Sequence, residues 1–189
     1  MRVVFKWATE PTAAFFNRLG IMPNTMTILG LVGTAIGAYF LARGQMTVGG
    51  IIILLMGPID ALDGTMARLR GEPTEFGAFV DSVTDRYAEL AIFGGLLYYY
   101  VQRGDWLLSI VTYLAAAGSV LVSYTRARAQ SLGHETKVGI LTRMERYIVL
   151  VPGLILNRPD ISLWILAILA NLTAVQRIWD VRRQAHHKK

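Results

Sequence analysis

The sequence predicts an all-α polytopic membrane protein with six transmembrane helices and an N-terminal interfacial helix. Three observations predict it: a high apolar content, a series of apolar runs, and an alternating distribution of positive charge. Hydrophobic residues make up 53% of the 189 residues and the mean hydropathy is +0.42, which is more than a soluble domain of this size needs for its core. A membrane environment is therefore the first expectation.

Six apolar runs are candidates for membrane spans. They cover residues 26–42, 46–59, 88–101, 106–124, 147–156 and 161–175. Several runs are shorter than the ~20 residues that a helix needs to cross a bilayer, so we expect these helices to continue into polar residues. Such polar residues would face other helices or a water-filled cavity, because lipid does not tolerate them.

Positive charge alternates along the chain. Of the 19 Lys and Arg residues, Arg43, Arg103 and Arg158 stand alone in short turn-like segments, and the others lie in the alternate connections and the two tails. The positive-inside rule places the basic segments in the cytosol. We therefore expect a multi-pass protein of the cell membrane with both termini and the active site on the cytosolic side. This distribution also accounts for the net charge of +6 without nucleic acid as a partner.

The expected elements form one domain over the whole chain, 1–189. Residues 1–20 are expected to form the interfacial helix, with Phe15 and Phe16 on its apolar side. A six-helix bundle is expected over residues 24–185, because no long linker and no repeat of fixed period divides the chain. The sequence contains no cysteine, which excludes a disulfide framework and a thiolate metal site or nucleophile.

Acidic residues follow the second apolar run. The second span is expected to reach about Leu69, where RGEP makes a turn, and the third span is expected to begin near Thr74. Helical spacing places the acidic residues and their neighbours on one face of each helix. The face before the turn contains Asp60, Asp63, Gly64, Ala67 and Arg68. The face after the turn contains Gly77, Asp81 and Asp85. The turn makes the two helices an antiparallel hairpin, so the four carboxylates can converge.

Four adjacent carboxylates repel one another and are costly in a medium of low dielectric constant. Hard divalent cations would neutralise them, and oxygen-only ligation suits Mg²⁺ or Mn²⁺. A pair of such ions bridged by carboxylates is a known arrangement for phosphoryl chemistry. One alternative is that the acids only form ion pairs with Arg68, Arg70 and Arg86 at the membrane edge. A cation transporter is the alternative in function, but its site would lie near the bilayer midplane rather than around a cytosolic turn.

The complete acidic pattern resembles the signature of the CDP-alcohol phosphotransferase family. It reads DxxDGxxAR, then eight residues, then GxxxDxxxD, and covers residues 60–85. The resemblance implies that Asp60, Asp63 and Asp81 bind two metal ions, and that Asp85 completes the second metal site and acts as general base on the acceptor hydroxyl. It also implies a CDP-linked lipid as donor and a homodimer.

The same resemblance implies a set of residues that contact the CDP moiety of the donor. Gly64 and Arg68 belong to the signature itself, and Arg68 has the charge to meet a phosphate. Thr74 lies in the turn, and Asn24 and Thr27 belong to a segment that resembles the PNxxT start of the family's first span. The alternative for these last three residues is a role as helix caps.

The acceptor has to be predicted from residues outside the signature. The segments SYTRARAQSLG, RMER and AVQRIWDV resemble SYxKARA, RPER and VQR in the branch of the family that uses inositol phosphate. They map Arg126, Arg146 and Arg177 as a pocket for the acceptor phosphate, with Arg128 and Arg143 as further members. Arginines hold phosphate through charge-assisted hydrogen bonds.

Two departures and two alternatives accompany this assignment. Arg126 stands where the branch has lysine, and Met144 stands where it has proline. Basic residues are also expected in cytosolic loops for reasons of topology alone. Glycerol 3-phosphate is another phosphorylated acceptor, so the branch that makes phosphatidylglycerol phosphate is the alternative within the family. The reaction expected is transfer of the phosphatidyl group of CDP-diacylglycerol to inositol phosphate, with release of CMP.

Overall fold

The described part of the chain folds entirely into helices joined by turns and one longer loop. The computed structural model describes the backbone of residues 6–71, 74–136 and 138–187, and the side chains of these residues except 6–9, 60, 61 and 187. The helices are α1 (Lys6–Arg18), α2 (Pro23–Ala42), α3 (Met46–Arg70), α4 (Glu75–Gln102), α5 (Trp106–Ser131), α6 (Arg143–Ile155) and α7 (Pro159–His187). The all-α prediction is confirmed for these residues.

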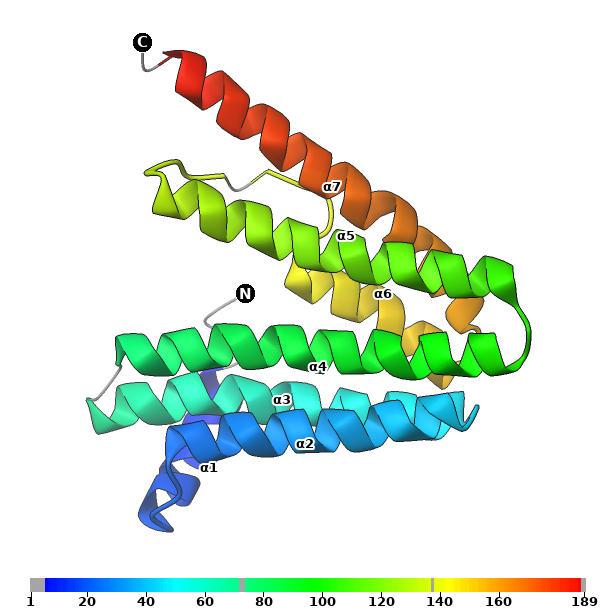
Figure 1. Cartoon of the computed structure of the whole chain (residues 1–189). Helices are drawn as coiled ribbons and strands as arrows, with labels where there is room; N and C mark the ends of the chain where they lie inside the picture. The colour runs from blue at the N-terminus through cyan, green and yellow to red at the C-terminus, as the bar shows by residue number, and fades with distance from the viewer. Residues whose placement is uncertain (1–5, 72–73, 137, 188–189) are drawn as a thin grey trace.

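The helices form two neighbouring groups (Figure 1). Helices α2, α3 and α4 pack side by side, and α5 packs along α7. The short helix α6 contacts both α3 and α7 and so joins the two groups, while α1 packs against α3. The α3–α4 turn lies at one end of the bundle, on the left in Figure 1, whereas α6 begins nearer the middle of the view. There its first residue, Arg143, contacts Asp85 of α4, so residues distant in sequence meet partway along α4.

Local sequence explains where the central helices begin and end. Gly71 closes α3 in a left-handed conformation with φ of 71°, which glycine adopts without a steric penalty. Thr74 caps α4 by accepting a hydrogen bond from the backbone N–H of Gly77 at 3.0 Å. The predicted hairpin between the two acidic segments is thus present. Asn24, expected to cap the first span, lies instead within the first turn of α2, because Pro23 already begins the helix.

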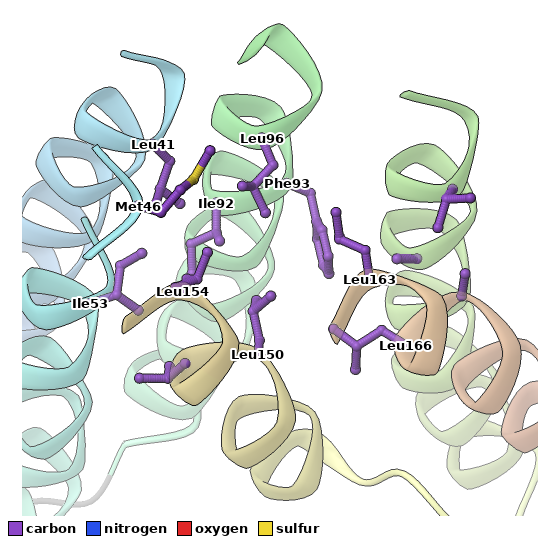
Figure 2. Packing of buried hydrophobic residues seen from close by; sticks show 14 of the residues in the cluster. Leu41, Met46, Ile53, Ile92, Phe93, Leu96, Leu150, Leu154, Leu163 and Leu166 are labelled. Atoms are coloured by element: carbon purple, nitrogen blue, oxygen red, sulfur yellow. The ribbon is translucent and has the colours of Figure 1, made fainter. Parts of the chain in front are cut away.

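The apolar core lies away from the acidic hairpin, where α4, α6 and α7 meet α2 and α3 (Figure 2). Figure 2 labels cluster residues of α2, α3, α4, α6 and α7, and Val111 and Ala115 of α5 belong to the same cluster. The labelled residues are Leu41, Met46, Ile53, Ile92, Phe93, Leu96, Leu150, Leu154, Leu163 and Leu166. Many large apolar side chains lie on the outside, among them Leu55, Ile110 and Ile168. An apolar exterior around an apolar core is expected of a bundle in lipid.

Within the described residues, four helices are long and apolar enough to cross a membrane: α2, α3, α5 and α7. Helix α4 has 28 residues, but Asp85, Arg86 and Glu89 lie in its middle turns. Helix α6 has 13 residues, which at about 1.5 Å per residue is shorter than the hydrocarbon layer. The apolar runs do continue into polar helical residues, as the sequence predicted. The protein is a membrane protein by these features.

Two adjacent glycines on α4 provide a test of the packing between α2 and α4. A Cβ at Gly95 would lie 2.4 Å from the backbone carbonyl oxygen of Ala38, whereas a Cβ at Gly94 would meet no atom of the described chain within 4 Å. We expect Gly95→Ala to lower the free energy of unfolding in detergent by about 1–3 kcal/mol, because backbone cannot move aside as a side chain can. Gly94→Ala is the matched control and should leave thermal stability unchanged or slightly higher. Equal melting temperatures for the two variants would contradict this packing.

Candidate functional site

Asp63 is buried near the end of α3 and held by the start of α2. The hydroxyl of Thr27 donates to one carboxylate oxygen of Asp63 at 2.6 Å, and both side chains are buried. The other oxygen accepts the backbone N–H of Gly64. A carboxylate whose direction is set by neighbouring donors resembles the oriented ligands found around metal ions. Thr27 is thus brought to the acidic hairpin, where the sequence placed it in the donor site.

Asn24 lies beside the start of α4. A Cβ at Gly77 would be 3.0 Å from the hydroxyl oxygen of Thr74 and 3.8 Å from the side-chain oxygen of Asn24. Substituents larger than hydrogen at position 77 would therefore crowd this junction. Thr74 acts as a helix cap, so the cap alternative is confirmed for this residue, although capping by itself does not define its part in binding.

The face of α3 around Gly64 is open. Apart from the backbone of α3 itself, a Cβ at Gly64 would meet only one atom of the described residues within 4 Å. This atom is Nη1 of Arg68, at 3.4 Å. Arg68 itself donates from Nη2 to the hydroxyl oxygen of Thr65 at 2.9 Å and is exposed. A ligand can therefore approach the backbone of α3 here, next to a guanidinium group.

Asp85 lies on α4 and forms ion pairs with two arginines. Its side chain is only 7% exposed and contacts Arg86 at 3.4 Å as well as Arg143, the first residue of α6. Arg143 is 52% exposed, so its guanidinium reaches from solvent to a buried carboxylate. The sequence named Arg143 only as a further member of the acceptor pocket, yet the structure brings it into direct contact with the predicted base.

The structure describes the side chains of three of the four predicted metal ligands. Asp63 and Asp85 are buried and Asp81 is half-buried, whereas the side chain of Asp60 lies outside the described residues. The described side chains contain no group of three His, Cys, Asp or Glu residues that could hold a metal ion. The chemistry of the donor set still fits a hard cation, because Asp63 is a buried carboxylate oriented by a hydroxyl. The four-aspartate site stays a prediction.

Arg177, on α7, is bound to backbone rather than to acidic groups in the described chain. It is 3% exposed, and it donates from Nε to the carbonyl of Val138 at 3.0 Å and from Nη1 to the carbonyl of Val122 at 2.5 Å. Its side chain therefore ties the loop between α5 and α6 to α5 and α7. Arg177 interacts electrostatically with Arg126 on α5 and Arg146 on α6. The three predicted acceptor arginines therefore lie in one region. Arg126 is exposed there.

Arg146, on α6, is bound by a residue that the sequence reasoning missed. Its Nε and Nη2 atoms lie 2.8 and 3.3 Å from the two carboxylate oxygens of Glu89, and its Nη1 donates to the carbonyl of Leu141 at 3.4 Å. The signal that could have found Glu89 is its spacing. It lies four residues after Asp85 on the same face of α4, as a further acid within an apolar run.

The start of α6 is fixed by a capping box. The backbone N–H of Thr142 donates to the carboxylate of Glu145, and the sequence T-R-M-E has the spacing that this motif requires. The cap therefore holds Arg143 and Arg146 in the first turn of a well-defined helix.

A cavity of about 80 Å³ lies between α2, α3, α4 and α6. Its polar lining includes Asp85, Glu89, Arg143, Arg146 and Tyr147, and the remainder is mainly apolar. The cavity thus connects the predicted base with two of the arginines. It places charged groups of both signs around one small space within the bundle.

These features define a class of membrane-bound transferase: the chain belongs to the CDP-alcohol phosphatidyltransferase family, whose family model matches residues 20–176. It is 38% identical over 200 aligned positions to the phosphatidylinositol phosphate synthase of Streptomyces avermitilis, covering 97% of this chain and 82% of that protein. The crystal structure of Mycobacterium tuberculosis phosphatidylinositol phosphate synthase with CDP-DAG bound superposes with a TM-score of 0.86 at 32% identity, covering 96% of this chain and 94% of that one. The structure of that synthase with manganese and citrate gives a TM-score of 0.87 at 33% identity, over 92% and 88% of the two chains.

The contacts of Arg177 predict a loss of stability on substitution. Arg177→Met should lower the free energy of unfolding by about 1–3 kcal/mol, because two carbonyl groups lose their buried donor. Arg126→Met, the same change at an exposed arginine of the same region, should leave the melting temperature in detergent unchanged. Limited proteolysis of the loop between α5 and α6 should be faster only in the Arg177 variant. Equal proteolysis of both variants would show that Arg177 does not hold the loop.

Proposed function

We propose that the protein transfers the phosphatidyl group of CDP-diacylglycerol to a hydroxyl of inositol phosphate and releases CMP. The observation that carries this proposal is the contact between Asp85 and Arg143, because it joins the signature carboxylates to the arginines that would hold a phosphorylated acceptor. The similarity to phosphatidylinositol phosphate synthases over nearly the whole chain supports the same acceptor.

The donor would bind at the hairpin end of the bundle. Asn24, Thr27, Gly64, Arg68 and Thr74 would contact the CDP moiety, with the open face of α3 admitting the diphosphate. Arg68 offers a planar guanidinium for charge-assisted hydrogen bonds to phosphate oxygens. The diacylglycerol chains would lie along the apolar exterior of the helices, since they need only generic apolar surface.

Asp60, Asp63, Asp81 and Asp85 would hold Mg²⁺ or Mn²⁺, with two ions in the complete site. Such ions supply positive charge that offsets the charge of the diphosphate and of the leaving CMP. The manganese in the similar synthase structure supports a divalent metal. Thr27 would act on this site indirectly, by keeping the Asp63 carboxylate in one direction.

The acceptor would bind on the side of α5, α6 and α7. Arg126, Arg146 and Arg177 would provide positive charge for its phosphate, and Arg143 would reach both the phosphate and Asp85. Asp85 would take the proton from the attacking hydroxyl, as a general base within hydrogen-bond reach of the acceptor. Once Arg143 engages the acceptor phosphate, the Asp85 carboxylate is released for this role.

The topology that fits this chemistry has six spans, formed by α2 to α7, with α1 lying at the membrane interface. Both termini, the hairpin and the loop between α5 and α6 would face the cytosol, where the positive charge is concentrated. We further propose that the protein resides in the cell membrane as a homodimer and as a single domain. The nucleotide and the inositol phosphate would then both arrive from the cytosol.

An acceptor screen tests the proposed reaction. Purified protein with CDP-diacylglycerol and Mg²⁺ or Mn²⁺ should release CMP with inositol phosphate and not with free inositol or serine, because the arginines require a phosphate. Removal of divalent cations with a chelator should abolish release, and their return should restore it. Release of CMP with glycerol 3-phosphate alone would instead assign the protein to the branch that makes phosphatidylglycerol phosphate.

The role of Asp85 is tested by its isosteric amide. Asp85→Asn should reduce turnover by at least about 10²-fold, since the amide cannot accept the hydroxyl proton, while the protein stays folded and binds CDP-diacylglycerol. Asp105→Asn is the matched control, because Asp105 caps α5 at the other end of the bundle and asparagine caps equally well. Undiminished turnover in Asp85→Asn would end the assignment of Asp85 as the base.

A further inference from the structure

Two ion pairs connect α4 to the first turn of α6. Asp85 and Glu89 lie one helical turn apart on α4, and Arg143 and Arg146 lie three residues apart on α6. Asp85 pairs with Arg143, and Glu89 pairs with Arg146. The two pairs border the same cavity. The second pair therefore lies one helical turn from the predicted base.

The Glu89–Arg146 pair is largely buried and is held by several hydrogen bonds. Arg146 is 3% exposed and Glu89 is 17% exposed. Glu89 contacts Arg146 with both oxygens, and Leu141 accepts a third hydrogen bond from Arg146. A guanidinium has five N–H groups in a rigid plane, so these contacts fix its direction and leave donors on Nη1 and Nη2 for a ligand.

The charges around this pair favour an anion. Arg86 interacts electrostatically with Asp85, Glu89, Arg143 and Arg146, while Arg177 on α7 interacts with Arg126, Arg146 and Glu145. These five arginines and three carboxylates sum to two positive charges. Glu89 thus neutralises part of the positive charge of the adjacent arginines. The net positive charge that remains would attract a phosphate.

We infer that Glu89 is a positioning residue for the acceptor. It holds the Arg146 guanidinium in one direction and the first turn of α6 against α4, so that Arg143 and Arg146 present the acceptor phosphate at a fixed distance from Asp85. This inference rests on the proposed function, because it assumes a phosphorylated acceptor on this side of the bundle. Glu89 itself touches no reacting atom in this scheme, and it acts through Arg146.

The first test is Glu89→Gln, measured by CMP release at varied concentrations of each substrate. We expect the KM for inositol phosphate to rise at least ~10-fold, because an arginine that loses its charged partner no longer holds one direction. The KM for CDP-diacylglycerol should stay within about twofold, since the donor residues lie on α2, α3 and the start of α4. Asp160→Asn is the matched control, because it removes an exposed ion pair with Arg158 at the other end of the bundle. It should change neither KM.

The exchanged pair, Glu89→Arg with Arg146→Glu, separates positioning from structural support. If the pair only holds α4 to α6, the exchange should restore thermal stability and both KM values together. If Glu89 positions Arg146 for the acceptor, the exchange should restore the melting temperature and leave the KM for CDP-diacylglycerol at its unmodified value, while the KM for inositol phosphate stays high. Restoration of all three would overturn the inference.

The remaining outcomes are also decisive. If Glu89→Gln does not fold in detergent, the same measurements are made on Glu89→Asp, which keeps the charge but shortens the side chain, and an unchanged KM for inositol phosphate there overturns the inference. If the unmodified protein uses inositol phosphate but Glu89→Gln shows the same KM, the inference alone fails. If the unmodified protein does not use inositol phosphate, the proposed function fails and the inference fails with it.

Discussion

The cost of burying charge on α4 is the constraint on which the rest of the site depends. Asp85 and Glu89 project from the middle of a long helix and are largely buried, where an unpaired carboxylate is expensive. Both are paired with arginines of α6. A buried pair is costly to break once made, so α6 is held by charge as well as by the apolar contacts of Leu150 and Leu154. The shortest of the six bundle helices α2 to α7 is therefore placed accurately beside the predicted base.

The close approach of the backbones of α2 and α4 supports the part of the site at the acidic hairpin. Gly95 lets α4 touch the backbone of α2 at Ala38, and at the other end of α2 Thr27 lies at the acidic hairpin. Small residues at such crossings are common in membrane bundles, where packing rather than the hydrophobic effect holds helices together. Thr27 then reaches Asp63, and Asn24 reaches the cap of α4. Rigid packing in the bundle thus sets the direction of side chains at its polar end.

The two sides of the site differ in the sign of their charged side chains. On the hairpin side, the predicted ligands are carboxylates, which fit the chemistry of divalent cations. On the side of α5, α6 and α7 lie the arginines, of which Arg177 is bound to two carbonyls and Arg146 to Glu89. Asp85 belongs to both sides through its contact with Arg143. A reaction that moves a phosphate group between two anionic substrates requires this division, because each substrate must be held without repelling the other.

The sequence by itself determined the helices, the hairpin and the family, because spacing along a helix decides which residues share a face. Asp60 to Asp85 form a local pattern that needs no knowledge of the fold. Only the tertiary structure decided the partners of the arginines. Arg146 pairs with Glu89 and Arg177 binds two backbone carbonyls, since these partners depend on which helix faces which across the bundle. The arrangement of the helices depends on packing between distant parts of the chain. The spacing of residues along a single helix does not reveal it.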